Sequence, residues 1–168
     1  MTRLIANRGF TLLEVLIALL IFSLGLLGMA GLMVVSVKAN QSAYLRTQAS
    51  FLAQSMADRM RANLGQIGTY ATTYPGPTAD PCAAGAACSP ANVAAHDMAL
   101  WSAQLTDSLP NASAQIACAG APLGVGTQIG AAPYNGLCTF TIQWSEASLD
   151  RNNTGNPDLQ TFAWVFQP

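Results

Sequence analysis

Few side chains in the sequence could act as catalytic acids, bases or nucleophiles. His96 is the only histidine, and Glu14 and Glu146 are the only glutamates. On a helix, His96 and its neighbour Asp97 would lie about 100° apart, so they could not form an orienting pair, and we expect His96 to be exposed to solvent. The sequence contains no G-x-S-x-G, P-loop or Rossmann glycine motif. We therefore expect no enzyme activity, no catalytic residue and no cofactor.

Four cysteines are the other candidates for covalent or metal chemistry: Cys82, Cys88, Cys118 and Cys138. All follow the apolar N-terminal region, and an even number of cysteines in a weakly charged region predicts disulfides formed in an oxidising compartment. A zinc site would need paired C-x2-C spacings, which the sequence lacks. Cysteine counting alone leaves three connectivities open.

A faint calcium-loop pattern begins at Asp150 and includes the segment Asp150–Gly155. Its twelfth position is Thr161, where a calcium loop needs a bidentate glutamate. Turn chemistry explains the asparagines and the glycine of this segment better than metal binding does. We therefore expect no metal site.

The segment Val15–Val35 has 21 consecutive residues without an ionisable side chain. At about 1.5 Å per residue, a helix of this length spans roughly 30 Å of hydrocarbon, which predicts a membrane anchor. Arg3 and Arg8 precede the segment. The positive-inside rule then places the N-terminus in the cytoplasm and the rest of the chain on the other side of the membrane.

Glu14 is the one ionisable residue between Phe10 and Val37. A carboxylate inside a membrane costs up to about 3 kcal/mol, so Glu14 should have a partner. A simpler role is to stabilise the positive N-terminal end of the helix. Both roles are compatible with the sequence.

A short basic leader ends at Gly9, directly before the run Phe10–Val15, F-T-L-L-E-V. Here the sequence resembles the type IV pilin family, which includes the pseudopilins of type II secretion. The resemblance implies that a prepilin peptidase of the inner membrane cuts between Gly9 and Phe10 and methylates the new amine of Phe10. It also implies that Glu14 draws that amine of a neighbouring subunit into register during assembly. A plain signal anchor is the alternative.

An apolar stripe continues the helix beyond the membrane segment: Leu45, Ala49, Leu52, Met56 and Met60. We expect one helix from Phe10 to about Leu64, with Gly65 as its stop. Ser89 and Pro90 predict the start of a second helix, which ends before Pro110. The domains predicted in this way are a leader at 1–9, a membrane-spanning half-helix at 10–37, an amphipathic half-helix at 38–64 and a globular domain at 65–168.

Alternating side chains predict three strands: Ala114–Ala119, Leu137–Trp144 and Gln160–Gln167. Cys118 and Cys138 could then bridge adjacent strands, and Cys82 and Cys88 could close a small loop. The expected fold is α+β: a long N-terminal helix packed on a small antiparallel sheet, with one extra helix. This combination again resembles a type IV pilin.

The run Met56–Asn63, M-A-D-R-M-R-A-N, resembles the PilV group of minor pilins, as does the cysteine loop followed by a helix with Asp97 and Trp101. The resemblance implies a low-abundance subunit that helps to start pilus assembly near the pilus tip. The implied partners are the prepilin peptidase, other minor pilins, the major pilin and a PilY-type tip adhesin. The implied location is the bacterial inner membrane, with the domain in the periplasm, and then the extracellular pilus.

Two alternatives remain within this family resemblance. A minor pseudopilin of a type II secretion system would carry the same N-terminal run. A DNA-binding competence pilin is disfavoured, because only five basic residues follow the apolar segment. We therefore expect no nucleic-acid partner.

Overall fold

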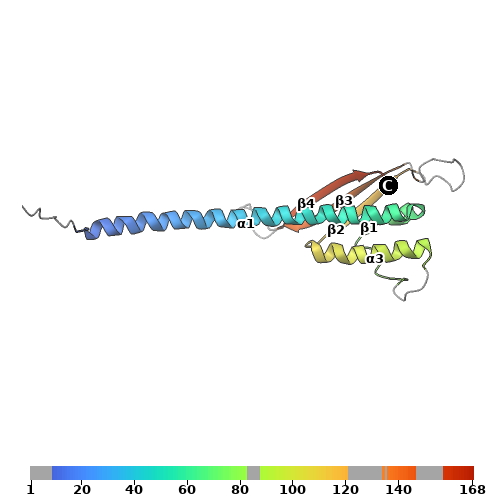
Figure 1. Ribbon diagram of the computed structural model, residues 1–168, viewed down its shortest axis with the longest axis horizontal. Helices are drawn as coiled ribbons and strands as arrows, with labels where there is room; N and C mark the ends of the chain where they lie inside the picture. Colours follow the sequence, from blue (N-terminus) through green and yellow to red (C-terminus); the bar gives the residue numbers. More distant parts are fainter. Residues whose placement is uncertain (1–8, 83–87, 121–133, 135, 147–156) are drawn as a thin grey trace, which may run out of the picture. The chain divides into compact units, whose positions relative to one another are not determined.

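The computed structural model describes residues 9–82, 88–120, 134, 136–146 and 157–168. Its elements, drawn in Figure 1, are α1 (Leu12–Ala62), a short 3-10 helix (Leu64–Gln66), α2 (Ile67–Tyr70), β1 (Thr73–Tyr74), α3 (Pro90–Ser108), β2 (Ser113–Ala119), β3 (Leu137–Glu146) and β4 (Asp158–Phe166). The chain divides into two compact units, Met1–Gln41 and Ser42–Pro168. The predicted α+β class is confirmed.

The described part of the first unit is the apolar portion of α1. The Thr11 hydroxyl accepts a hydrogen bond from the backbone N–H of Glu14, as an N-terminal capping residue does. The large apolar residues that follow, from Leu12 to Val37, are between 49 % and 81 % exposed. Among the described residues, α1 is the one helix whose length and composition would let it cross a membrane.

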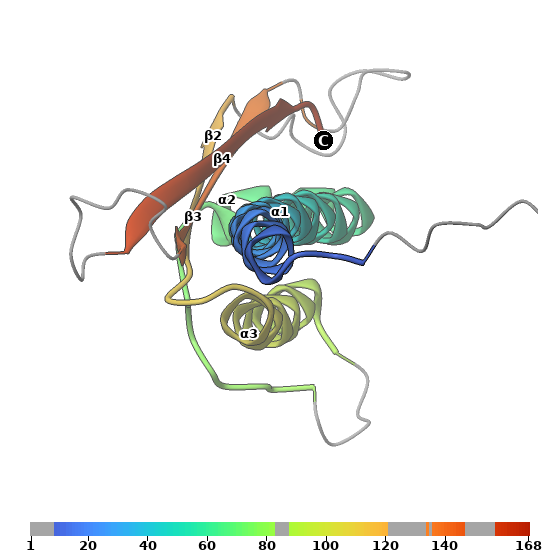
Figure 2. The same ribbon diagram turned by 90° about the vertical axis from the view of Figure 1, so that its left-hand side faces the viewer.

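In the second unit, one face of α1 is buried as the apolar stripe predicts. Its buried side chains are Ala49, Leu52, Ala53, Met56, Ala57 and Met60. Figures 1 and 2 show this part of α1 lying between the sheet and α3. The alanines on this face allow the helix to approach its neighbours closely, while leucine and the two methionines fill the core.

The sheet is antiparallel and has the strand order β1-β2-β3-β4. Alternate residues of β3 are buried, with Phe140, Ile142 and Trp144 on the face toward the core. Phe140, Trp164 and Phe166 form a stack of rings on this face. The three predicted strands are confirmed, each with slightly different ends.

Helix α3 begins where the sequence predicts. The Ser89 hydroxyl accepts a hydrogen bond from the backbone N–H of Asn92, and Pro90 is the first helical residue. One apolar face of α3 and the residue that caps its end are buried in the core: Ala94, Met98, Trp101, Leu105 and Leu109.

The sequence reasoning missed the elements between α1 and Pro75. Helix α1 ends at Ala62 rather than near Leu64, and a short 3-10 helix and α2 follow it. Strand β1 has only two residues, Thr73 and Tyr74, which pair with β2. Elements of two to four residues carry too little periodicity to be recognised from their own sequence.

Candidate functional site

The segment before α1 presents the predicted processing site. Phe10 is 84 % exposed, and Gly9 precedes it outside any helix or strand. A β-carbon added to Gly9 would meet no atom within 4 Å, so the described fold does not require glycine at this position. Any requirement for a small residue there must come from another molecule.

Glu14 lies in the first turn of α1, near Phe10. The two residues border an apolar hollow along the helix, with Val15, Ala18, Leu19 and Phe22. No cationic group among the described residues pairs with the Glu14 carboxylate. The carboxylate can therefore accept a cation from another chain at this surface.

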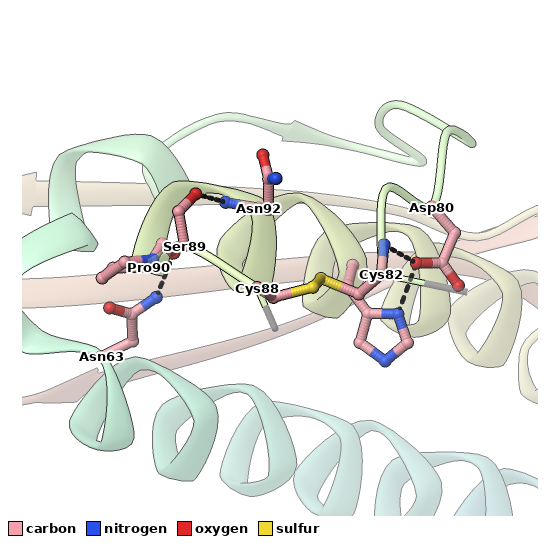
Figure 3. The surroundings of a disulfide bond; sticks show 8 residues. Asn63, Asp80, Cys82, Cys88, Ser89, Pro90 and Asn92 are labelled. Carbon is pink, nitrogen blue, oxygen red and sulfur yellow. Dashed lines mark hydrogen bonds and ion pairs between the residues drawn. A yellow bond between two sulfur atoms is a disulfide. The ribbon is translucent and has the colours of Figure 1, made fainter. Parts of the chain in front are cut away.

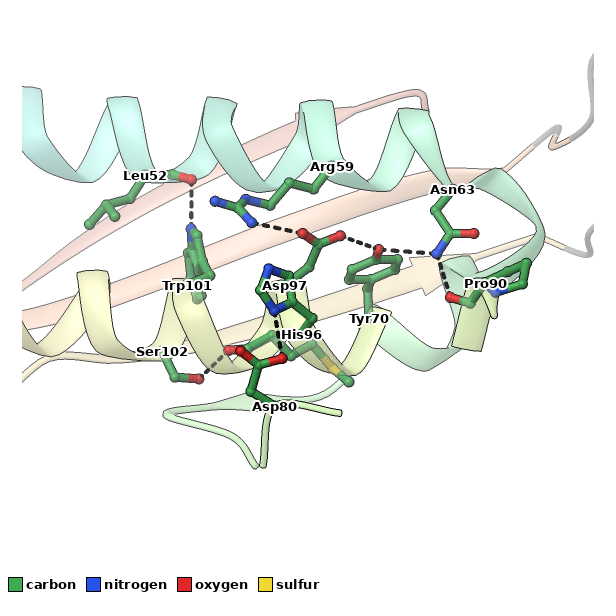
Figure 4. Close-up of polar contacts among 11 residues, drawn as sticks. Leu52, Arg59, Asn63, Tyr70, Asp80, Pro90, His96, Asp97, Trp101 and Ser102 are labelled. Carbon is green, nitrogen blue, oxygen red and sulfur yellow. Dashed lines mark hydrogen bonds and ion pairs between the residues drawn. The ribbon is translucent and has the colours of Figure 1, made fainter. Parts of the chain in front are cut away.

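A cluster of polar groups joins α1, α2 and α3 in the second unit, and we call it the polar cluster. It consists of Arg59, Asn63, Tyr70, Asp97 and the carbonyl group of Pro90 (Figure 4). The Arg59 guanidinium lies 2.7 Å from Oδ1 of Asp97, and the Tyr70 hydroxyl donates to Oδ2 at 2.8 Å. The Asn63 side chain donates to the Pro90 carbonyl at 2.8 Å.

Burial controls the electrostatics of the polar cluster. Asp97 is buried, and an ionised carboxylate in such a place is stable only when it is paired and hydrogen-bonded. Burial raises the pKa of Tyr70 to about 12, and the hydrogen bond to Asp97 adds to this effect. Tyr70 therefore stays a neutral donor to Asp97 at physiological pH. Burial also raises the pKa of Tyr74, whose hydroxyl donates to the Tyr70 carbonyl.

Trp101 provides a second link between α3 and α1. Its indole N–H donates to the backbone carbonyl of Leu52 at 2.9 Å, and the rings of Trp101 and Tyr74 pack in a T-shaped arrangement. The residue is fully buried. Through Trp101 and the polar cluster, α3 holds both the middle and the end of the buried half of α1.

The first disulfide joins Cys82 and Cys88 in front of α3 (Figure 3). The Asp80 carboxylate accepts a hydrogen bond from the backbone N–H of Cys82 and lies 2.6 Å from Nδ1 of His96. The expectation that His96 is exposed is wrong, because its side chain is only 32 % exposed and contacts Asp80. Asp80 lies in a loop 16 residues before His96, so the residues next to His96 in the sequence do not indicate this contact.

The second disulfide joins Cys118 of β2 to Cys138 of β3, which are directly paired in the sheet. The backbones of Gly120 and Gly136 lie in close contact, each two residues away from one of these cysteines. A β-carbon on Gly136 would lie 2.1 Å from the Ala119 carbonyl oxygen, and Gly120 has a φ of 135°. Both positions therefore require glycine.

Sequence reasoning missed Arg59, Asn63 and Tyr70 as members of one cluster. A usable signal was present, because Arg59 and Asn63 lie four residues apart at the border of the apolar stripe. Among the described residues, no group of three His, Cys, Asp or Glu side chains could hold a metal ion. The calcium-like segment Asp150–Gly155 lies outside the described residues.

Two family models match adjoining parts of the chain. Residues 5–30 match the prokaryotic N-terminal methylation motif. Residues 31–99 match a model described as type IV pilin Tt1218, and this range contains the whole polar cluster. No curated protein and no solved structure gave a significant match.

Proposed function

The chain belongs to the type IV pilin family, and we propose that within it the protein is a minor pilin of the PilV kind, which helps to start pilus assembly at or near the pilus tip. Pilins are structural proteins, and the methylation motif implies processing by a prepilin peptidase and assembly with other pilins. The apolar part of α1 is consistent with a membrane-anchored precursor. The tip position and the minor role are the proposal.

Exposure of the segment around Gly9 and Phe10 supports processing at this bond. A peptidase needs an extended, accessible segment, and Phe10 is outside the helix and largely exposed. Because the fold leaves space at Gly9, the glycine is best explained by close approach of the peptidase to the backbone. The product would carry a methylated amine on Phe10.

No described residue pairs with the Glu14 carboxylate, and this supports a role of Glu14 in subunit assembly. An ionised group in an apolar layer gains most from a cation brought by a neighbouring chain. The methylated amine of Phe10 on another pilin would be such a cation. The same contact would fix the stagger between two otherwise uniform apolar helices.

The polar cluster is the observation that carries the PilV assignment. The run Met56–Asn63 resembles the PilV group, and two of its residues contact α3. Arg59 contacts Asp97, and Asn63 contacts the Pro90 carbonyl. Of the two parts of the chain that resemble the PilV group, the run therefore contacts the helix that follows the cysteine loop. A minor pseudopilin of type II secretion stays the alternative, since it would share the N-terminal run.

We further propose that the precursor crosses the inner membrane once, with its N-terminus in the cytoplasm and its domain in the periplasm, before it enters the pilus. Its partners would be other minor pilins and the major pilin, through the N-terminal helix, and a PilY-type tip adhesin. Between Asn63 and Ser145 the full charges are three aspartates. Contacts of the domain should therefore depend more on shape and hydrogen bonds than on salt bridges.

Deletion of the gene separates the two candidate functions. A minor pilin of the PilV kind predicts few or no surface pili and unchanged enzyme secretion. Restoring the wild-type gene should restore the pili, whereas Glu14→Ala should not, because it removes the partner for the incoming amine. Normal pili together with blocked enzyme secretion would instead identify a pseudopilin.

A further inference from the structure

Strand β4 is an open edge of the sheet. It pairs with β3 residue by residue from Asp158 to Phe166, without a bulge, and no described residue pairs with its other side. Asp158 is its only charged residue, and it contains no proline. Natural sheets usually protect long edges with lysine, proline, a bulge or a short strand. The opposite edge is short, since β1 has two residues, but β4 has none of these protections.

The core-facing side of β4 is also incompletely covered. Phe162 and Trp164 remain partly exposed, whereas their cross-strand neighbours Ile142 and Phe140 on β3 are buried. Within the described part of the chain, the aromatic face therefore continues to the edge at β4 without a neighbouring strand to cover it. One more strand beside β4 would complete this coverage.

Two arginines of α1 mark the ends of this uncovered strip. Arg46 donates a hydrogen bond to Gln160 at 2.9 Å, and Arg61 lies over the ring of Phe166 at 5.3 Å. Between these arginines on the same flank of α1, Ser50 is partly exposed, whereas Ala53 and Ala57 are already buried in the core. The side chains of an added strand would therefore meet the partly exposed rings of Phe162 and Trp164.

From these observations we propose that β4 accepts an additional strand, an extended segment of another subunit in the same assembly. Outward-pointing N–H and C=O groups recognise an extended backbone and no other secondary structure. The segment should be uncharged over its centre, like β4 itself, with apolar residues alternating toward α1. An acidic residue near either end would meet Arg46 or Arg61. This proposal rests on the proposed function, because the added strand is expected to come from another subunit of a pilin assembly.

A second copy of this chain fits the edge less well. Two copies paired by a twofold axis through β4 would place their β4 strands antiparallel. In Figure 1, β4 runs in about the same direction as the part of α1 after Ser42. The two α1 segments would then also run in opposite directions, although chains anchored in one membrane start from the same side.

Two lysine variants of the full-length chain test the proposal. Ala163→Lys places a charge at the middle of the edge strand, and Thr141→Lys places the same charge on the same face of β3, directly across from it. Each chain is immunoprecipitated from solubilised inner membranes, and the other pilins recovered with it are quantified. We expect Ala163→Lys to lower their recovery at least tenfold and Thr141→Lys to change it less than twofold.

Amide hydrogen exchange on the recovered wild-type complex identifies strand pairing itself. Exchange in β4 should slow at least tenfold relative to the free chain, while exchange in β2 should stay the same. If other pilins are recovered but β4 is not protected, or if both lysine variants recover them equally, strand addition is wrong and the proposed function stands. If the wild type recovers no other pilin, the proposed function is wrong and the edge proposal fails with it.

Discussion

The guanidinium of Arg59 on α1 lies 2.7 Å from the carboxylate of Asp97 on α3. This contact joins α1 to α3, the helix that follows the cysteine loop, and the Tyr70 hydroxyl donates a further hydrogen bond to Asp97. A buried pair of this kind adds little net stability, but loss of one partner is costly because the other charge stays buried. Its main effect is therefore to fix how α3 lies on α1.

Replacing Arg59 tests this relationship. Arg59→Met keeps most of the side-chain volume but leaves Asp97 without its cation, and we expect a loss of about 2–4 kcal/mol in the free energy of unfolding. The measurement is urea unfolding of the full-length chain in detergent, followed by tryptophan fluorescence. Asp58→Ala is the matched control, because it removes the exposed pair with Arg61 and should cost less than about 0.5 kcal/mol. Equal effects of the two substitutions would contradict the account.

The raised pKa of Tyr70 predicts alkaline instability. The pKa is about 12 in the folded chain and 10.0 for an unperturbed tyrosine. The contribution of neutral Tyr70 to the free energy of unfolding should therefore be present in full below about pH 10. It should be lost between about pH 10 and 12, because in that range the unfolded chain loses the Tyr70 proton more easily than the folded chain. Unfolding measured at several pH values should show this fall.

Tyr70→Phe should reduce the slope of that profile while lowering stability at neutral pH, because it removes the donor to Asp97. Some slope should remain, since burial also raises the pKa of Tyr74. Tyr44→Phe, which changes an exposed tyrosine of α1, is the control. An unchanged slope in Tyr70→Phe would show that Tyr70 is not the group responsible.

The two disulfides should stabilise the domain by different amounts. Their cysteines are 20 and 6 residues apart, and loop-closure entropy then predicts about 3 kcal/mol for Cys118–Cys138 and about 2 kcal/mol for Cys82–Cys88. Paired Cys→Ala variants give these values by denaturant unfolding. Peptide mapping without reduction provides an independent check, and a Cys82–Cys118 or Cys88–Cys138 peptide would contradict the sheet described here.

Because Gly120 and Gly136 lie in close contact, the loss of stability on replacing a glycine by alanine should depend strongly on which glycine is replaced. Gly136→Ala should destabilise the domain by about 1–3 kcal/mol, because its methyl group would overlap the Ala119 carbonyl. Gly68→Ala should be close to neutral, since no atom lies within 4 Å of its added carbon. Similar unfolding midpoints for the two variants would show that the backbone around Gly136 can shift to accept the added methyl group, and would contradict this prediction.

The sequence was informative wherever a pattern was long. The stripe on α1 and the alternation in β3 extend over many residues, and the cap at Ser89 with Pro90 is a short but specific signal, so the corresponding elements were predicted correctly. Short elements were missed, because β1 forms only through pairing with β2. The polar cluster and the His96–Asp80 contact were missed for a related reason. Their partners are distant in sequence, and only the packing of α1, α3 and the intervening loop brings them together.

The most direct test of the pilin assignment is mass spectrometry of the chain in sheared pili, with the inner membrane as the second fraction. We predict that the chain is present in the pili, begins at Phe10 and carries one additional methyl group. Gly9→Val should leave the full-length chain in the membrane, because a branched side chain would keep the peptidase from the backbone. A full-length chain found only in the membrane of wild-type cells, or a Gly9→Val chain that is still cut and still enters pili, would contradict this account.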